Sequence, residues 1–311
     1  MNRSQKYFDP ETLAAIQPLS LRARTLVEGL VAGMHRSPQR GSSAEFAQHR
    51  EYVPGDDIRQ VDWKVFARSD RYYLKQYEDE TNLSCYFFVD QSESMDFRGS
   101  QSPLSKLEYV QLVSCALAYL ITSQQDQAGL VTYSKSIDAW LPASSSISQF
   151  DDFVHLFDQG AITREGSART KITRTTDLPA AVHDFVTRLK KPALVVICSD
   201  MLGELVDSQR ALSLLAHAGH DVVLLHTLDN DEMHFPFDQA TQFEGLEGLP
   251  DLTTDPRPIA MAYRRAMQQF QQDLQVICRQ QNADYFLLNT ADSLARELPR
   301  ILANRRRSTR N

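Results

Sequence analysis

Long apolar segments are missing from this chain. No run of apolar residues approaches the ~20 that a helix needs to cross a bilayer. The first residues, MNRSQKYFDPET, also lack the apolar stretch of a secretory signal. The sequence therefore predicts a cytoplasmic protein without a membrane span.

The chain also has few cysteines and no excess of positive charge. The four cysteines (Cys85, Cys115, Cys198 and Cys278) are far apart and form no CxxC pair, so we expect reduced core thiols rather than a zinc site. The formal net charge is -7, whereas a nucleic-acid surface needs clustered Lys and Arg. We expect no nucleic-acid partner.

The common catalytic signatures are also missing. The chain contains no GxGxxG, GxxxxGK[ST], GxSxG or HExxH motif, and its eight histidines are scattered. These absences disfavour ATP binding by the chain itself and the familiar hydrolase mechanisms.

What the sequence does contain is an alternation of apolar strands and amphipathic helices. At 311 residues and 42% hydrophobic content, it can bury a substantial core. We predict an α/β fold, a doubly wound and mostly parallel sheet with helices on both faces. An N-terminal extension would cover residues 1–81, the α/β domain residues 82–303 with an insertion at about 231–258, and a basic tail residues 304–311.

The strands and helices of that domain follow from apolar periodicity. Ser105 and Glu108 form a capping-box signal before one helix, and Pro, Gly and alternating Phe between residues 231 and 258 suggest a hairpin. The expected strands are 85–89, 129–133, 137–141, 193–198, 222–226 and 285–288, and the expected helices begin near residues 105, 150, 178 and 263.

A DxSxS pattern follows the first expected strand. Asp90, Ser92 and Ser94 alternate with other residues where the apolar run stops. A hard cation such as Mg²⁺ binds oxygen ligands at roughly 2.0 to 2.1 Å in octahedral geometry. Two neutral hydroxyls with few carboxylates leave such an ion able to accept one more anion, which an Asp or Glu of a client protein could supply.

This spacing resembles the metal-ion-dependent adhesion site (MIDAS) of von Willebrand A domains. The resemblance implies a divalent cation, Mg²⁺ or Mn²⁺, with a Thr from a second loop and an Asp from a third. Thr176 and Asp200 have the matching order and spacing. The family commonly has Gly before the threonine, so Thr175 remains an alternative. Thr176 is preferred, with Asp177 as the N-cap of the next helix.

A chance match is the competing interpretation, in which Asp90 and the serines only cap a turn. The buried strand before the motif, the capped helix after it and the partners in register favour a metal site.

A second signature lies in Glu45–Lys64, a charged segment around a Pro-Gly turn. From the residues alone we expect a structural cluster of paired charges with inward-packed aromatic rings rather than direct ligand contacts. Its characteristic residues are Arg50, Tyr52, Pro54, Gly55, Asp56, Asp57, Arg59, Asp62 and Trp63.

The stretch EFAQHREYVPGDDIRQVDWKVFARSDRYYLKQYEDE resembles the hallmark of domain-of-unknown-function family fifty-eight (DUF58), and the likeness extends from about Leu21 to near Leu302. The resemblance implies a von Willebrand A-like core and a non-enzymatic, metal-dependent protein-binding module. It also implies an adaptor or chaperone-like role beside a MoxR-type AAA+ ATPase.

An enzymatic alternative is a metal-dependent phosphohydrolase that uses Asp90 as its nucleophile. Such enzymes usually need a second carboxylate two residues on, where this chain has Ser92, and the sequence suggests no partnering role for any lysine. A third class, binding to nucleic acid or anionic lipid through the Arg-rich tail 304–311, is less favoured than a solvated tail.

Overall fold

The structure of this chain is a computed structural model. It describes Leu19, Ala23, Leu26, Val27, Phe66 and residues 49–51, 72–75, 84–146, 148–167 and 174–308. The chain forms two compact units, Met34–Asn82 and a larger unit made of Met1–Gly33 with Leu83–Asn311. Each unit is described by itself below.

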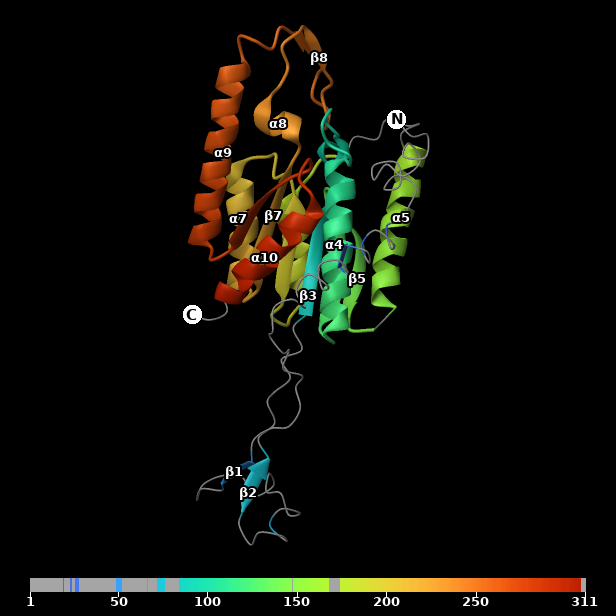
Figure 1. The fold of residues 1–311 in the computed structure, drawn as a ribbon, viewed down its shortest axis with the longest axis vertical. Coiled ribbons are helices and arrows are strands. Elements are labelled where there is room, and N and C mark those ends of the chain that lie inside the picture. The colour runs from blue at the N-terminus through green and yellow to red at the C-terminus, as the bar shows by residue number, and fades with distance from the viewer. Residues whose placement is uncertain are drawn as a thin grey trace, which may run out of the picture. The chain divides into compact units, whose positions relative to one another are not determined.

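The larger unit is built on a six-stranded sheet with the order β10-β7-β6-β3-β4-β5 (Figure 1). Every neighbouring pair is parallel except β4 with β5, which is antiparallel and closes one edge. The predicted doubly wound, mostly parallel sheet is confirmed. Its strands are β3 (Ser84–Asp90), β4 (Gln127–Tyr133), β5 (Ile137–Ser144), β6 (Leu194–Ser199), β7 (Asp221–Leu228) and β10 (Asp284–Asn289).

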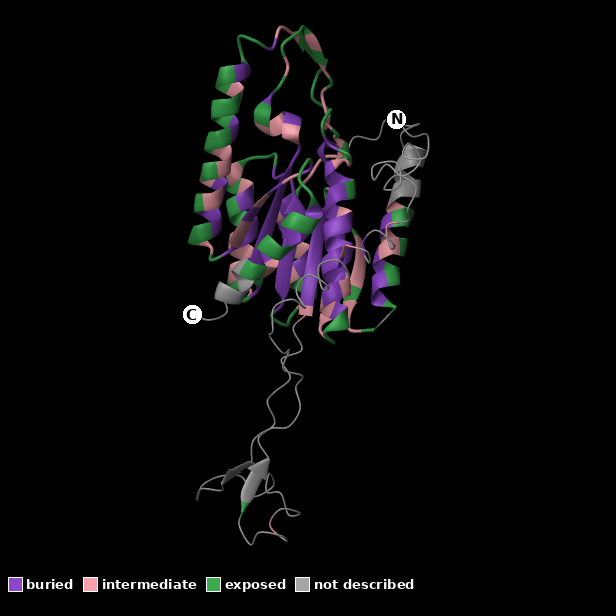
Figure 2. Ribbon diagram, in the orientation of Figure 1, coloured by how far each residue is buried: buried purple, intermediate pink, exposed green. Residues whose placement is uncertain are grey.

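Helices cover both faces of the sheet because successive side chains of a buried strand point to opposite sides. In β3, Phe87 packs in the cluster formed with α4, α5 and α10, whereas Phe88 packs in the cluster formed with α6, α7 and α9. Figure 2 shows the resulting buried centre between exposed outer helix faces. The helices are α4 (Lys106–Ser123), α5 (Gln149–Ser167), α6 (Leu178–Arg188), α7 (Leu205–His217), α9 (Ala260–Gln280) and α10 (Leu294–Ser308).

The strand order reverses between β3 and β6. From β3 the chain runs outward to β4 and β5, and it then returns to place β6 on the other side of β3. In open α/β sheets, ligands bind beyond the carboxyl ends of the strands at such a reversal. The loops after Asp90 and Ser199 therefore meet where a binding site is expected.

The predicted insertion contains the expected hairpin. Helix α8 (Asn230–His234) follows β7, and strands β8 (Thr241–Phe243) and β9 (Leu252–Thr254) then pair in antiparallel fashion. The rings of Phe235, Phe237 and Phe243 stack or meet edge to face, and Tyr263 of α9 packs on Phe235. This aromatic cluster joins the hairpin to α9.

The amino-terminal part is described at few positions. Ala23 and Val27 are buried in the core of the larger unit. In the smaller unit, β1 (His49–Glu51) pairs antiparallel with β2 (Tyr73–Lys75), and Phe66 stacks on Tyr72. Among the signature residues, only the backbone of Arg50 is described; the others, from Tyr52 to Trp63, lie outside the described residues.

Gly99 joins the loop after β3 to the end of β7. Its amide donates to Asp229 Oδ2 at 3.0 Å, and the Ser100 amide donates to Asp231 Oδ2 at 2.7 Å. A Cβ atom at position 99 would lie 2.0 Å from Asp229 Oδ1 and 2.8 Å from Asp231 Cγ. The close approach of the two loops therefore requires glycine at this position.

We expect Gly99→Ala to lower the free energy of unfolding by about 1–3 kcal/mol, because the new methyl group forces its loop away from the buried Asp229 and Asp231 to which that loop is hydrogen-bonded. Urea unfolding of the parent and the variant measures the loss. Gly203→Ala is the matched control, since a Cβ there meets nothing within 4 Å. Equal losses in the two variants would show that the loop contact is not tight.

Candidate metal site

Asp90 is the last residue of β3 and is completely buried. Its Oδ1 accepts a hydrogen bond from the Ser92 amide at 2.8 Å, and its Oδ2 accepts one from Ser199 Oγ at 2.8 Å. The carboxylate is thus fixed in orientation from two loops.

Ser92 and Ser94 place their hydroxyls side by side. Ser92 precedes a short 3-10 helix, η3 (Glu93–Asp96), and this turn brings the two Oγ atoms to 3.1 Å. Adjacent ligands of an octahedral Mg²⁺ are separated by roughly 2.8 to 3.0 Å. The serine pair is therefore spaced nearly as two neighbouring ligands of one ion.

Thr176 enters the site from the segment before α6. Its hydroxyl donates to Asp90 Oδ2 over a long 3.5 Å. The segment is held by Arg174, whose carbonyl accepts from the Glu93 amide and whose guanidinium binds the Gln91 carbonyl and Asp96. Asp177 caps α6 by accepting from the Ala180 amide, as its position in the sequence predicts. Thr176 is thus the threonine whose hydroxyl reaches Asp90.

Asp200 follows β6 and is 2% exposed. Its Oδ1 accepts from the Leu202 amide at 3.1 Å, and its Oδ2 accepts from Lys106 Nζ at 2.8 Å. Lys106 thus has a partnering role that the sequence did not suggest. A lysine that is distant in sequence could not be paired with Asp200 from spacing alone.

Lys106 lies in the first turn of α4 with its side chain completely buried. Besides Asp200, its ammonium donates to Glu232 Oε1 at 2.6 Å. Glu232 Oε2 in turn accepts from the Asp229 amide in the capping box of α8. One buried cation thus bridges the loop after β6 and the helix that opens the insertion.

The two aspartates have opposite pKa shifts. Burial, and then the nearby charge of Asp200, raise the pKa of Asp90 to about 7. Burial would also raise the pKa of Asp200, but the charge of Lys106 and its hydrogen bond outweigh burial and hold that pKa below its usual range. Asp90 is therefore the carboxylate whose ionisation a further cation would favour most.

The residues present fit a small divalent cation. Asp90, Ser92, Ser94, Thr176 and Asp200 come together from three loops, and all five offer oxygen. Within the described part of the chain, no group of three or more His, Cys, Asp and Glu could hold a metal ion. A cation at this position would therefore depend on hydroxyl ligands, which suit Mg²⁺ and Mn²⁺ better than zinc.

Sequence reasoning missed two further polar residues beside the site. Ser199 binds Asp90 and also accepts from the Met201 amide. His226 is bonded through Nε2 to the Asp200 carbonyl at 2.9 Å, and burial lowers its pKa to about 4. The position of Ser199 immediately before Asp200 was a usable signal, whereas His226 becomes a neighbour only through the pairing of β6 with β7.

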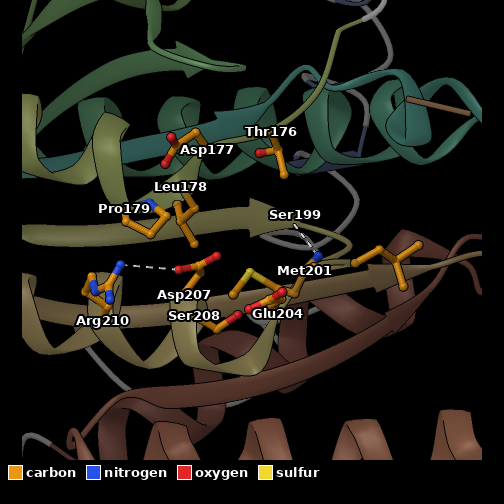
Figure 3. A pocket seen from close by; sticks show the side chains of 12 residues that line it. Thr176, Asp177, Leu178, Pro179, Ser199, Met201, Glu204, Asp207, Ser208 and Arg210 are labelled. Atoms are coloured by element: carbon orange, nitrogen blue, oxygen red, sulfur yellow. Dashed lines mark hydrogen bonds and ion pairs between the residues drawn. The ribbon is translucent and has the colours of Figure 1, made fainter. Parts of the chain in front are cut away.

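A pocket of about 290 Å³ opens beside these residues (Figure 3). Thr176 and Ser199, both bonded to Asp90, form part of its wall. The remaining wall comes from the beginnings of α6 and α7 and the loop that precedes α7. The candidate metal site and the pocket are therefore contiguous.

The strand order and the helices on both faces of the sheet define a doubly wound α/β domain, with the Asp-Ser-Ser loop at the reversal of that order. The chain belongs to the family described as protein of unknown function DUF58, which matches residues 48–273. Uncharacterized proteins of Mycobacterium bovis and Mycobacterium tuberculosis are 24% identical to it over 301 residues, covering 96% of this chain and 91% of theirs.

Solved structures with similar folds were found too. The hypothetical protein BatB from Bacteroides thetaiotaomicron covers 71% of this chain and 98% of its own, with 13% identity and a TM-score of 0.45. An aerotolerance-related membrane protein from Bacteroides fragilis covers 70% and 97%, with 15% identity and a TM-score of 0.45. In the part of the present chain that the structure describes, no helix has the length and apolar character to cross a membrane.

Lys106→Met tests whether the buried ammonium compensates the two carboxylates. The substitution keeps an unbranched apolar stem but leaves the buried Asp200 and the partly buried Glu232 without their cation. We expect the free energy of unfolding to fall by about 3–5 kcal/mol, measured by urea unfolding in the presence of a chelator.

The control is Lys135→Met, which removes an exposed ammonium and should change stability by less than about 0.5 kcal/mol. A loss in Lys106→Met no larger than in this control would contradict the compensating role.

Proposed function

We propose that this chain is a non-enzymatic, divalent-cation-dependent protein-binding module. Asp90, Ser92, Ser94, Thr176 and Asp200 would hold Mg²⁺ or Mn²⁺, with Asp200 acting through a water molecule. The observation that carries the proposal is the convergence of these five side chains at the reversal of the sheet, with the serine hydroxyls at 3.1 Å.

The charges of the site support an open coordination shell. Lys106 already neutralises much of the charge of Asp200, so Asp90 is the main carboxylate left to balance a divalent ion. A cation with so little compensating charge binds another anion readily. An Asp or Glu of a client protein is the anion that a protein-binding module would accept.

Membership of the family supports a proposal about the larger assembly. As a DUF58 protein, the chain is proposed to act as an adaptor or chaperone-like partner of a MoxR-type AAA+ ATPase. The absence of the common nucleotide-binding motifs from its sequence agrees with this division of labour.

Lys106 is an observation in favour of the phosphohydrolase alternative, because a lysine beside an aspartate is a frequent element of phosphoryl-transfer sites. The surroundings of Asp90 oppose it. An attacking carboxylate must reach the phosphorus atom, whereas Asp90 is 0% exposed and both of its oxygens accept hydrogen bonds. Binding remains the function that the geometry supports best.

Calorimetric titration with Mg²⁺ tests the metal site directly. We expect one binding event in the parent and at least a tenfold weaker affinity in Asp90→Ala, because the principal uncompensated carboxylate is lost. Ser94→Ala should also weaken binding while leaving both carboxylates in place. Asp221→Ala removes an exposed carboxylate at the opposite end of the strands and should bind as the parent does. Equal affinities in the parent and Asp90→Ala would refute the proposed site.

Pull-down of a MoxR-type AAA+ ATPase from the same organism tests the partner. We expect capture in Mg²⁺, because the cation would complete its shell with an acidic residue of the bound protein, and loss of capture in chelator or in Asp90→Ala. Asp221→Ala again serves as the control. Capture unaffected by chelator would separate ATPase binding from the metal, and no capture in Mg²⁺ would contradict the partnership.

A further inference from the structure

The wall of the pocket beside the candidate metal site has an apolar part and a polar part. Its apolar part includes Leu178, Pro179 and Met201, of which Leu178 and Met201 are buried. Its polar part includes Asp207, exposed Glu204 and Arg210. A volume of about 290 Å³ lies just below the usual range for small-molecule sites and suits one long side chain.

The charged groups of the pocket leave an excess of negative charge. Three carboxylates, those of Asp177, Glu204 and Asp207, face one guanidinium, that of Arg210, which leaves two negative charges in excess. Arg210 lies 3.5 Å from Asp207, as the dashed line in Figure 3 marks. Glu204 has no ion-pair partner among the described residues.

The helix ends do not reverse this balance. Two helices, α6 and α7, begin at the pocket, and each N-terminus is equivalent to roughly half a positive charge. Together they offset about one of the two excess negative charges. The amide of Ala180 is already bonded to Asp177, and those of Asp207 and Ser208 to the Glu204 carbonyl. The pocket therefore remains net negative and lacks these amides as donors for an anion.

We propose that this pocket binds a basic side chain, lysine or arginine, of the same partner segment whose acidic residue completes the metal shell. The cationic head would lie against Glu204 and Asp207, and the aliphatic stem would pack on Met201 and Leu178, as long basic side chains do on apolar surface. This inference rests on the proposed metal-dependent function and states which partner segments that function would select.

The contiguity of the two sites explains why one segment would serve both. Thr176 and Ser199 belong to the pocket wall and also bond to Asp90, so the acidic and basic groups of the partner would enter neighbouring positions. A divalent cation at one end and excess carboxylates at the other favour a partner in which an acidic and a basic residue lie close together.

A peptide library with one fixed central Glu and randomised flanking positions tests this specificity. The library is displayed on phage and selected on the full-length protein in Mg²⁺ and, separately, in chelator. We expect peptides to be retained only in Mg²⁺, with Lys or Arg enriched at least fivefold over the input at one flanking position.

Glu204→Lys reverses one charge of the pocket and should abolish this enrichment while keeping retention in Mg²⁺. The control, Asp221→Lys, makes the same change of charge at the opposite end of the sheet and should select as the parent does. For a synthetic copy of the most enriched peptide, we expect at least fivefold weaker binding to Glu204→Lys than to Asp221→Lys. Urea unfolding of both variants verifies that each remains folded.

The outcomes separate the two proposals. Retention in Mg²⁺ without a basic preference, or with the same preference in Glu204→Lys, overturns the pocket inference and leaves metal-dependent binding intact. Enrichment of acidic residues at the flanking positions overturns it too, since the pocket would then favour anions. Equal retention in Mg²⁺ and chelator contradicts the proposed function, and the pocket inference falls with it.

Discussion

The burial of two like-charged carboxylates at the reversal of the sheet is the constraint around which this domain is organised. Asp90 ends β3 and Asp200 directly follows β6, so the parallel pairing of these two strands brings the carboxylates together. Burial raises the pKa of Asp90, and the charge of Asp200 raises it further. Burying these charges costs free energy, and the buried ammonium of Lys106 offsets part of that cost by donating hydrogen bonds to Asp200 and Glu232.

The surrounding loops are held by contacts that serve the same constraint. Arg174 joins the threonine loop to the loop after β3. Gly99 lets the far end of that loop approach Asp229 closely enough for hydrogen bonding. Through the Glu232 capping box, Lys106 links the loops of the candidate site to the helix that begins the insertion. The candidate site is thus positioned from several directions before any ligand arrives.

The hairpin of the insertion reaches the same loop from another direction. The Glu247 amide, in the turn between β8 and β9, donates to Glu93 Oε2 at 3.0 Å. Glu93 lies between the two serines of the DxSxS motif, so the insertion contacts a side chain of the loop that carries the hydroxyls. This contact gives the insertion a structural reason to fold beside the site, which its sequence did not suggest.

The sequence by itself determined the local features: the buried strand before Asp90, the capping box at Ser105, the cap at Asp177 and the alternation that yields a doubly wound sheet. These follow from periodicity and from hydrogen bonds between residues a few positions apart. The sequence also selected the aspartates and hydroxyls that converge, because each follows a strand or precedes a helix.

Only the tertiary structure decided the partners of those groups. Lys106 and Asp200 are separated by ninety-four positions, and their ion pair exists because α4 packs over the strand order β6-β3. On the other face of the sheet, the packing of α6 beside α7 creates the pocket from two helix starts that no spacing rule connects. Charge compensation and cavity shape depend on distances between side chains in space. The order in which the strands pair sets these distances.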